Sequence, residues 1–109
     1  MPEFKKKNQR KRPVEKNKRQ LLRLFISGAG GSSLQAKNNF MEMYESELKD
    51  YYLYEIIDIL EYPEVALEYN VFVVPMLIKD TPQHKVNIIG NLEDKEKVLI
   101  TLQISAQNE

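Results

Sequence analysis

Short apolar runs and amphipathic stretches alternate along the chain. The first run, Gln20 to Ser27, is nearly continuous, which predicts a strand covered on both faces. After a glycine-rich turn, one helical stripe of apolar positions follows at Leu34, Met41, Tyr44 and Leu48. Ser32 precedes Gln35 by three residues, the spacing of a capping box, so we expect this helix to begin there.

The rest of the pattern predicts three more strands and two more helices. Tyr51 to Leu60 is rich in aromatic and β-branched residues, as strands are, and Pro63 to Tyr69 opens with the proline and early acid of a helix. Val71 to Lys79, interrupted by Pro75, and Lys85 to Gly90 are the expected third and fourth strands. Asn91 is the expected cap of the last helix. The order is β-α-β-α-β-β-α, an α/β fold.

The last apolar segment fits two structures. Val98, Leu99 and Leu102 fall on one side of a helix. Val98, Ile100, Leu102 and Ile104 also alternate as the residues of a strand do. Local propensity does not decide between them, so both readings stay open.

Composition limits the chain to one domain and removes several kinds of chemistry. The 109 residues are 42% hydrophobic and 29% charged, as in a single globular domain. The absence of cysteine excludes disulfides, zinc–thiolate sites, iron–sulfur clusters and thiol catalysis in this chain. No apolar run approaches the ~20 residues of a membrane span, and the N-terminus is too polar for a secretory signal. We therefore expect a cytoplasmic protein without membrane association.

Charge divides the chain into a basic arm and an acidic body. Nine of the fifteen residues from Lys5 to Arg19 are Lys or Arg, against the single acid Glu15. From Gln20 onward, seven Lys or Arg face fourteen Asp or Glu. We predict a basic arm over 1–19, a folded domain over 20–105 and a short tail over 106–109. The arm is interpreted as a solvated tail, with binding to nucleic acid or an acidic protein surface as the alternative.

Candidate catalytic chemistry is sparse. The turn from Gly28 to Ser33 lacks the third glycine of a dinucleotide fingerprint and the Lys-Ser or Lys-Thr of a P-loop, so we interpret it as a turn that needs free backbone. The only histidine, His84, lies in a polar turn and is expected to be exposed. Asp58, inside an apolar strand, is interpreted as a strand-edge or partner contact rather than a general base. We predict no catalytic residue, no metal site and no cofactor.

Three ungapped segments carry a resemblance to a known family: "LRLFISG", "EIIDILEYPEVALEYNVFVVPMLIK" and "NIIGNLEDKEKVLITL". They resemble the KaiB family, whose members have a thioredoxin-like fold, over about Gln20 to Ile104. Pro75 stands where thioredoxin-like proteins place a cis-proline. The turn from Gly28 to Ser33 stands where they carry a redox cysteine pair, and it contains no cysteine.

The resemblance implies a non-catalytic regulatory binding protein of a circadian clock or a stress response, with a non-clock branch of the family as the alternative to a clock protein. The same resemblance implies that the chain docks on a KaiC-like ATPase and forms a homo-oligomer, a dimer or a tetramer. It also implies that the C-terminal half has a second, ground-state arrangement beside the thioredoxin-like one. The candidate fold-switch residues are Pro63, Pro75, Pro82, Thr101 and Gln103, the last two standing where the family has Gly and Asp. The candidate partner-binding residues are Glu55, Asp58, Glu61, Glu64 and Glu68; cyanobacterial members have lysine at two of these positions, 55 and 61. The spacing of positions 61, 64 and 68 predicts that their side chains lie on one side of a helix. The alternative function is binding of nucleic acid or an acidic surface through the basic arm.

Overall fold

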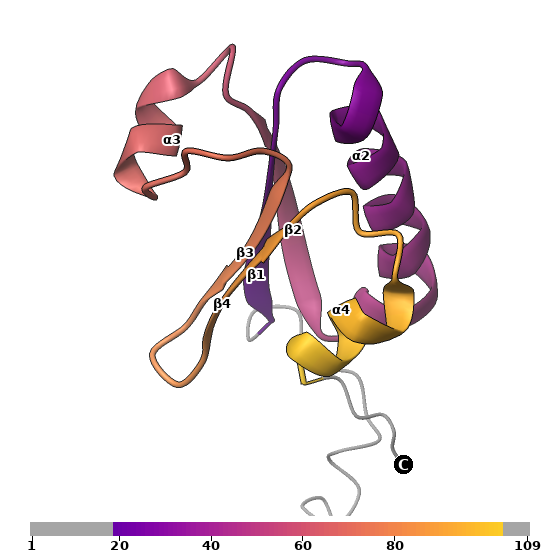
Figure 1. Ribbon diagram of the computed structural model, residues 1–109. Helices are drawn as coiled ribbons and strands as arrows, with labels where there is room; N and C mark the ends of the chain where they lie inside the picture. The colour runs from indigo at the N-terminus through magenta and orange to yellow at the C-terminus, as the bar shows by residue number, and fades with distance from the viewer. Residues whose placement is uncertain (1–18, 104–109) are drawn as a thin grey trace, which may run out of the picture.

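The computed structural model describes residues 19–103 (Figure 1). Residues 1–18 of the predicted basic arm lie outside the described residues, and so do residues 104–109, which include Ile104 and the predicted tail. Strands and helices alternate in the predicted order: β1 (Gln20–Ile26), α2 (Gly31–Met43), η3 (Tyr44–Leu48), β2 (Tyr52–Asp58), α3 (Pro63–Glu68), β3 (Met76–Asp80), β4 (Lys85–Ile89) and α4 (Lys95–Thr101). The segment η3 is one π-helical turn that continues α2.

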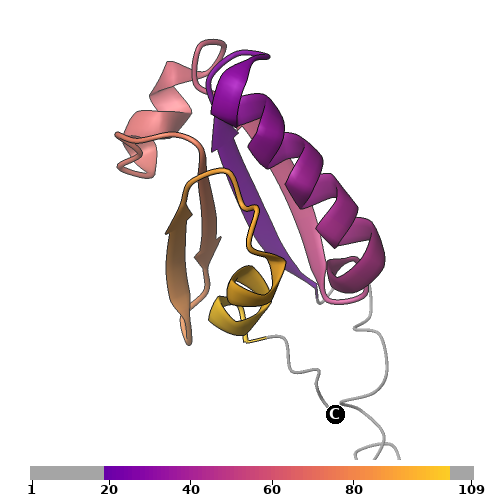
Figure 2. The ribbon, with the colours of Figure 1, turned by 45° about the vertical axis from the view of Figure 1, so that its right-hand side comes forward.

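The four strands form one sheet in the order β2-β1-β3-β4. β1 runs parallel to β2, from Gln20 opposite Tyr52 to Ile26 opposite Asp58. β3 is antiparallel to both β1 and β4. Helices α2 and α4 cover one face of the sheet, and α3 lies on the other side, at the end where β1 and β2 finish (Figures 1 and 2).

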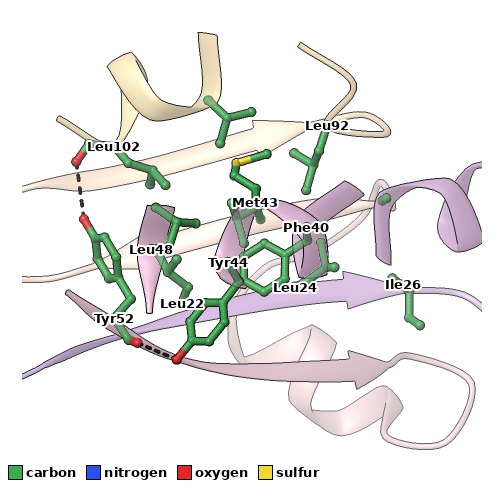
Figure 3. Packing of buried hydrophobic residues seen from close by; sticks show 13 residues of the cluster. Leu22, Leu24, Ile26, Phe40, Met43, Tyr44, Leu48, Tyr52, Leu92 and Leu102 are labelled. Carbon is green, nitrogen blue, oxygen red and sulfur yellow. Dashed lines mark hydrogen bonds between the residues drawn. The ribbon is translucent and has the colours of Figure 1, made fainter. Parts of the chain in front are cut away.

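The central strand β1 supplies side chains to both faces, as its continuous apolar run predicts. Leu22 and Leu24 point into the main core between the sheet and helices α2 and α4, where both are fully buried (Figure 3). Phe25, which lies between Leu24 and Ile26 in the sequence, points the other way and is fully buried in the smaller core beneath α3. Each buried side chain of this size contributes about 1.5–3 kcal/mol by leaving water.

The last segment is a helix, which answers the ambiguity left by its sequence. Val98 and Leu102 enter the main core, whereas Ile100 is 74% exposed, so only the helical periodicity matches the burial. The cap is Asp94, whose side chain accepts a hydrogen bond of 3.1 Å from the backbone N–H of Lys97. The prediction of Asn91 as the cap is wrong, because its side chain instead accepts from the N–H of Glu93 in the preceding turn.

Two buried side chains of the sheet meet the C-terminal end of α4. The Lys79 ammonium donates to the carbonyl oxygen of Leu102 at 3.4 Å. The Tyr52 hydroxyl donates to the same oxygen at 3.3 Å (Figure 3). The Lys79 ammonium also lies 5.5 Å from the centre of the Tyr52 ring. Burial lowers the pKa of Lys79 and raises the pKa of Tyr52 to about 12. A positive charge is favourable at this helix end because the carbonyl dipoles point toward it.

Helix α2 differs from its predicted form at both ends. It begins at Gly31 with Gly30 as its cap and no side-chain capping bond, so the predicted capping box is wrong. Phe40 and Met43 face the core, whereas Leu34 is 44% exposed, so the predicted stripe is wrong at its first position. The π-helical turn η3 then brings the two later stripe residues, Tyr44 and Leu48, into the core.

The third strand starts later than predicted. Residues 71–74 are not part of the sheet, and β3 begins at Met76, directly after the cis peptide bond between Val74 and Pro75. Val71 is buried beneath α3, whereas Phe72 and Val73 are 78% and 50% exposed. A run of apolar residues therefore crosses the surface instead of continuing a strand.

Candidate partner-binding face

The glycine-rich turn between β1 and α2 is closed by hydrogen bonds of the chain itself. The Ser33 hydroxyl accepts from the backbone N–H of Ser27 at 2.9 Å. Gly28 has a φ of 73°, a left-handed conformation that favours glycine, and its N–H donates to the Asp58 carboxylate at 3.1 Å. The first bond joins the end of β1 to the start of α2, and the second joins it to the end of β2.

Asp58 connects the turn that follows β1 with the turn that follows β2. Besides the bond from Gly28, its carboxylate accepts a hydrogen bond of 2.9 Å from the backbone N–H of Leu60, two residues later. Asp58 was predicted to contact a partner, but here its Oδ1 atom binds the backbone of its own chain. Its role as a partner contact stays a prediction.

Replacing Asp58 by alanine is expected to lower the free energy of unfolding by about 1–3 kcal/mol, because two backbone N–H groups lose their acceptor. Asparagine keeps the Oδ1 acceptor, so Asp58→Asn is the matched control and should retain most of the stability. Urea unfolding measures both variants. A partner affinity that falls for Asp58→Asn at unchanged stability would instead assign the charge of Asp58 to docking.

The four predicted glutamates lie in three different settings. Glu55 is in the middle of β2 and pairs with the Arg23 side chain on the neighbouring strand at 3.4 Å. Glu64 and Glu68 are exposed on α3, one helical turn apart. Glu61 precedes the helix in a turn, so the prediction that 61, 64 and 68 share one helix side is wrong for Glu61.

Exposed apolar side chains lie on α3 and on the segments that flank it, a feature that the sequence analysis missed. Ala66 of α3 is buried against the sheet, which leaves Leu67 exposed on the outer side, and the segments before and after α3 add further apolar side chains. The exposed fractions are 70% for Leu60, 50% for Tyr62, 68% for Leu67, 78% for Phe72 and 50% for Val73. Together with Glu61, Glu64 and Glu68, these residues are called the α3 surface below.

His84 and the acids of the described chain offer no metal site. No group of three or more His, Asp or Glu side chains within residues 19–103 is arranged to hold a metal ion. His84 is half-buried in the turn between β3 and β4, not exposed as expected, and its backbone is hydrogen-bonded to Thr81. Over the same residues, no helix has the length and apolar content needed to cross a bilayer.

Comparison with known proteins assigns the family. The family model described as "KaiB domain" matches residues 23–104. The chain belongs to the KaiB family. Similar KaiB proteins include the circadian clock oscillator protein of Prochlorococcus marinus, 39% identical over 77% of this chain and 78% of its own length. The circadian clock protein KaiB3 of Synechocystis is 43% identical over 77% of this chain and 82% of its own. By their names, these two relatives are circadian clock proteins.

Solved structures confirm the thioredoxin-like fold expected for a KaiB protein. Chloroplastic thioredoxin z superimposes with a TM-score of 0.64 at 19% identity, over 95% of this chain and 89% of its own. The Drosophila melanogaster thioredoxin Deadhead superimposes with a TM-score of 0.65 at 12% identity, over 93% of this chain and 89% of its own. The N-terminal domain of Synechococcus elongatus SasA superimposes with a TM-score of 0.53 at 21% identity, over 84% of this chain and 89% of its own. At these identities the likeness concerns the fold alone.

The residues predicted to govern a KaiB fold switch lie at the ends of elements in the C-terminal half. Pro63 is the first residue of α3, Pro75 precedes β3, and Pro82 lies in the turn between β3 and β4. Thr101 ends α4, where its hydroxyl donates to the Lys97 carbonyl oxygen at 2.7 Å. Gln103 follows with a φ of 65°, a left-handed conformation that Asp adopts more readily than Gln. Their role in switching stays a prediction.

Proposed function

We propose that this chain is a non-catalytic regulator that docks on a KaiC-like ATPase through the α3 surface. Membership of a family of clock proteins supports the class of partner. The observation that carries the place of contact is the set of large apolar side chains exposed on α3 and on its flanking segments, of which Phe72 and Leu67 are among the most exposed. Exposed apolar patches rimmed by polar groups are typical of protein interaction sites.

The chemistry of the α3 surface indicates what the ATPase must present. Between Asp50 and Ile78 the sequence has six acids and no Lys or Arg. Apolar side chains at the centre of an interface supply most of the affinity, and charges at the rim direct the approach. The complementary surface is therefore an apolar depression edged by Lys or Arg side chains.

Replacing Phe72 by serine is expected to weaken binding to the ATPase at least ~10-fold, equivalent to about 1.4 kcal/mol, because a central aromatic contact is lost. Ile100→Ser is the matched control, since Ile100 is 74% exposed but lies on α4. Titration by fluorescence anisotropy with the ATPase from the same organism measures both. Weakening by Ile100→Ser but not by Phe72→Ser would move the docking site to α4.

The glutamates of the α3 surface are expected to affect the rate of association with the ATPase. Reversing Glu61 and Glu64 to lysine should slow association with the ATPase, most strongly at low salt, because rim charges act mainly on the encounter rate. Reversing Glu93 and Glu96, near the start of α4, is the control of equal charge. Equal association rates for all three proteins would remove the α3 acids from the docking surface.

The proposal includes three further properties implied by the family. The chain acts in the cytoplasm, forms a homo-oligomer in the absence of the ATPase, and docks in the thioredoxin-like arrangement described above. Size-exclusion chromatography with and without the ATPase tests the last two, because docking should convert the homo-oligomer into a complex that contains single copies of this chain.

A further inference from the structure

The α3 surface has acids without basic partners. Glu61, Glu64 and Glu68 are exposed, and none of them pairs with a Lys or Arg side chain within residues 19–103. The nearest bases along the sequence are Lys49 and Lys79, and Lys79 is buried on the other side of the sheet against α4. Arg23 reaches this side of the sheet, with its guanidinium 4.5 Å from the centre of the Tyr69 ring, but it pairs with Glu55. The three glutamates of the α3 surface therefore have no paired base among the described residues.

The same chain contains a segment of opposite charge outside the described residues. From Lys5 to Arg12, six of the eight residues are Lys or Arg and none is an acid. Phe4, immediately before this segment, adds one aromatic side chain. Attraction between such a segment and the α3 surface is expected from charge alone, and a tether raises the local concentration of the segment to the millimolar range.

The distances allow the contact within one molecule. The segment joins β1 at Gln20, which lies at the end of the sheet opposite α3 (Figures 1 and 2). A seven-residue strand such as β1 is ~23 Å long at ~3.3 Å per residue. Lys5 to Arg12 precede Gln20 by 8 to 15 residues, and a chain of that length spans up to roughly 26–50 Å.

We propose that the basic segment Lys5 to Arg12 binds the acidic α3 surface of its own chain and covers it until a partner displaces it. Single exposed charge pairs contribute only ~0.2–1 kcal/mol each, so the contact depends on several pairs acting together and is released by salt. The contact does not depend on the identity of the partner. Only its consequence, competition with the ATPase, rests on the proposed function.

The lack of cysteine makes the contact directly measurable. Asn8→Cys introduces a single thiol in the full-length chain, to which a nitroxide spin label is attached. We expect the backbone amide signals of Glu61, Glu64 and Glu68 to lose more than about half of their intensity at ~0.01 M salt, where charges act over ~30 Å. The signals should recover at ~1 M salt, where this distance falls to ~3 Å.

Two charge variants make the result specific. The triple variant Glu61→Gln, Glu64→Gln, Glu68→Gln should keep the fold and abolish the loss of signal. The double variant Glu93→Gln, Glu96→Gln removes acids near α4 and should leave the loss unchanged. Equal losses in both variants, or a loss confined to other acids such as Glu45 and Asp50, would overturn the proposal.

A mixing experiment tests whether the contact lies within one chain. Spin-labelled chains without ¹⁵N are mixed with unlabelled ¹⁵N chains, so that only contacts between molecules reduce the signals. No loss in the mixture, beside a clear loss in the directly labelled chain, supports the proposal. A full loss in the mixture would assign the α3 surface to the basic segment of a second copy and overturn it. Because no ATPase is present, failure of the docking proposal leaves this result unaffected.

Discussion

Phe40→Ala is expected to lower the free energy of unfolding by about 3–5 kcal/mol, the usual effect of removing a large aromatic side chain from a core. Phe40 is fully buried between α2 and the sheet. Its ring lies 5.9 Å from that of Tyr44 and 5.6 Å from that of Tyr54, so its loss also removes two aromatic contacts. Urea unfolding followed by circular dichroism measures the change.

Leu34→Ala on the same helix is the matched control. Its side chain is 44% exposed, so we expect a loss below about 1 kcal/mol. The sequence pattern placed Leu34 in the core stripe, whereas the structure places Phe40 there. Comparable losses for the two variants would support the sequence pattern and contradict the burial described for α2.

Lys79→Glu is expected to destabilise the docking of α4 by about 3 kcal/mol or more at neutral pH, because a carboxylate is then buried against a carbonyl oxygen. Lys79 is 6% exposed and donates to the Leu102 carbonyl. The introduced carboxyl group must lose its charge or leave the core. Its pKa is therefore raised in the folded state, and the loss of stability should shrink as the pH falls and the group becomes protonated.

The effect should be local as well as large. Amide hydrogen exchange should accelerate over residues 95–102, while β1 stays protected. Lys79→Met is the control, because methionine has the length of glutamate without its charge, and Tyr52 still donates to the Leu102 carbonyl. Unfolding free energies that agree for the Glu and Met variants would show that this site does not discriminate charge.

The sequence predicts the parts of the fold in which local pattern and tertiary burial agree. The continuous run of β1 matches a strand that is buried on both faces. Pro63 followed by Glu64 marks the start of α3 correctly, because both residues suit a helix N-terminus in any context. Such agreement lets the order of elements be read from the chain alone.

Prediction of secondary structure from the sequence fails where contacts between residues far apart in the chain determine which element forms. Val98 to Leu102 suits helix and strand equally, and the outcome depends on Leu102 reaching Tyr52 and Lys79 on two different strands. The π-helical turn η3 also has no sign in the local sequence, although the burial of Tyr44 and Leu48 within it was predicted correctly. No window of neighbouring residues contains these partners.

The candidate site was half predicted. Charge is visible in a sequence, so the acids of α3 were found. The exposure of a side chain is not visible in a sequence. Phe72 and Val73 were predicted as strand residues because apolar runs usually enter a sheet. An apolar run that ends in Pro75 was the available signal, since proline interrupts the hydrogen bonds of a strand.

The central position of β1 in the sheet has a consequence for synthesis of the protein. β1 leaves the ribosome before both of its neighbours in the sheet, β2 and β3, and β3 ends at Asp80. About 60 residues follow Gln20 before β3 is complete, which takes roughly 3–12 s at ~5–20 residues per second. During that interval an apolar strand has unpaired edges open to other nascent chains. The speed of translation over β2, α3 and β3 therefore sets how long each new molecule is exposed to mispairing, however stable the finished sheet is.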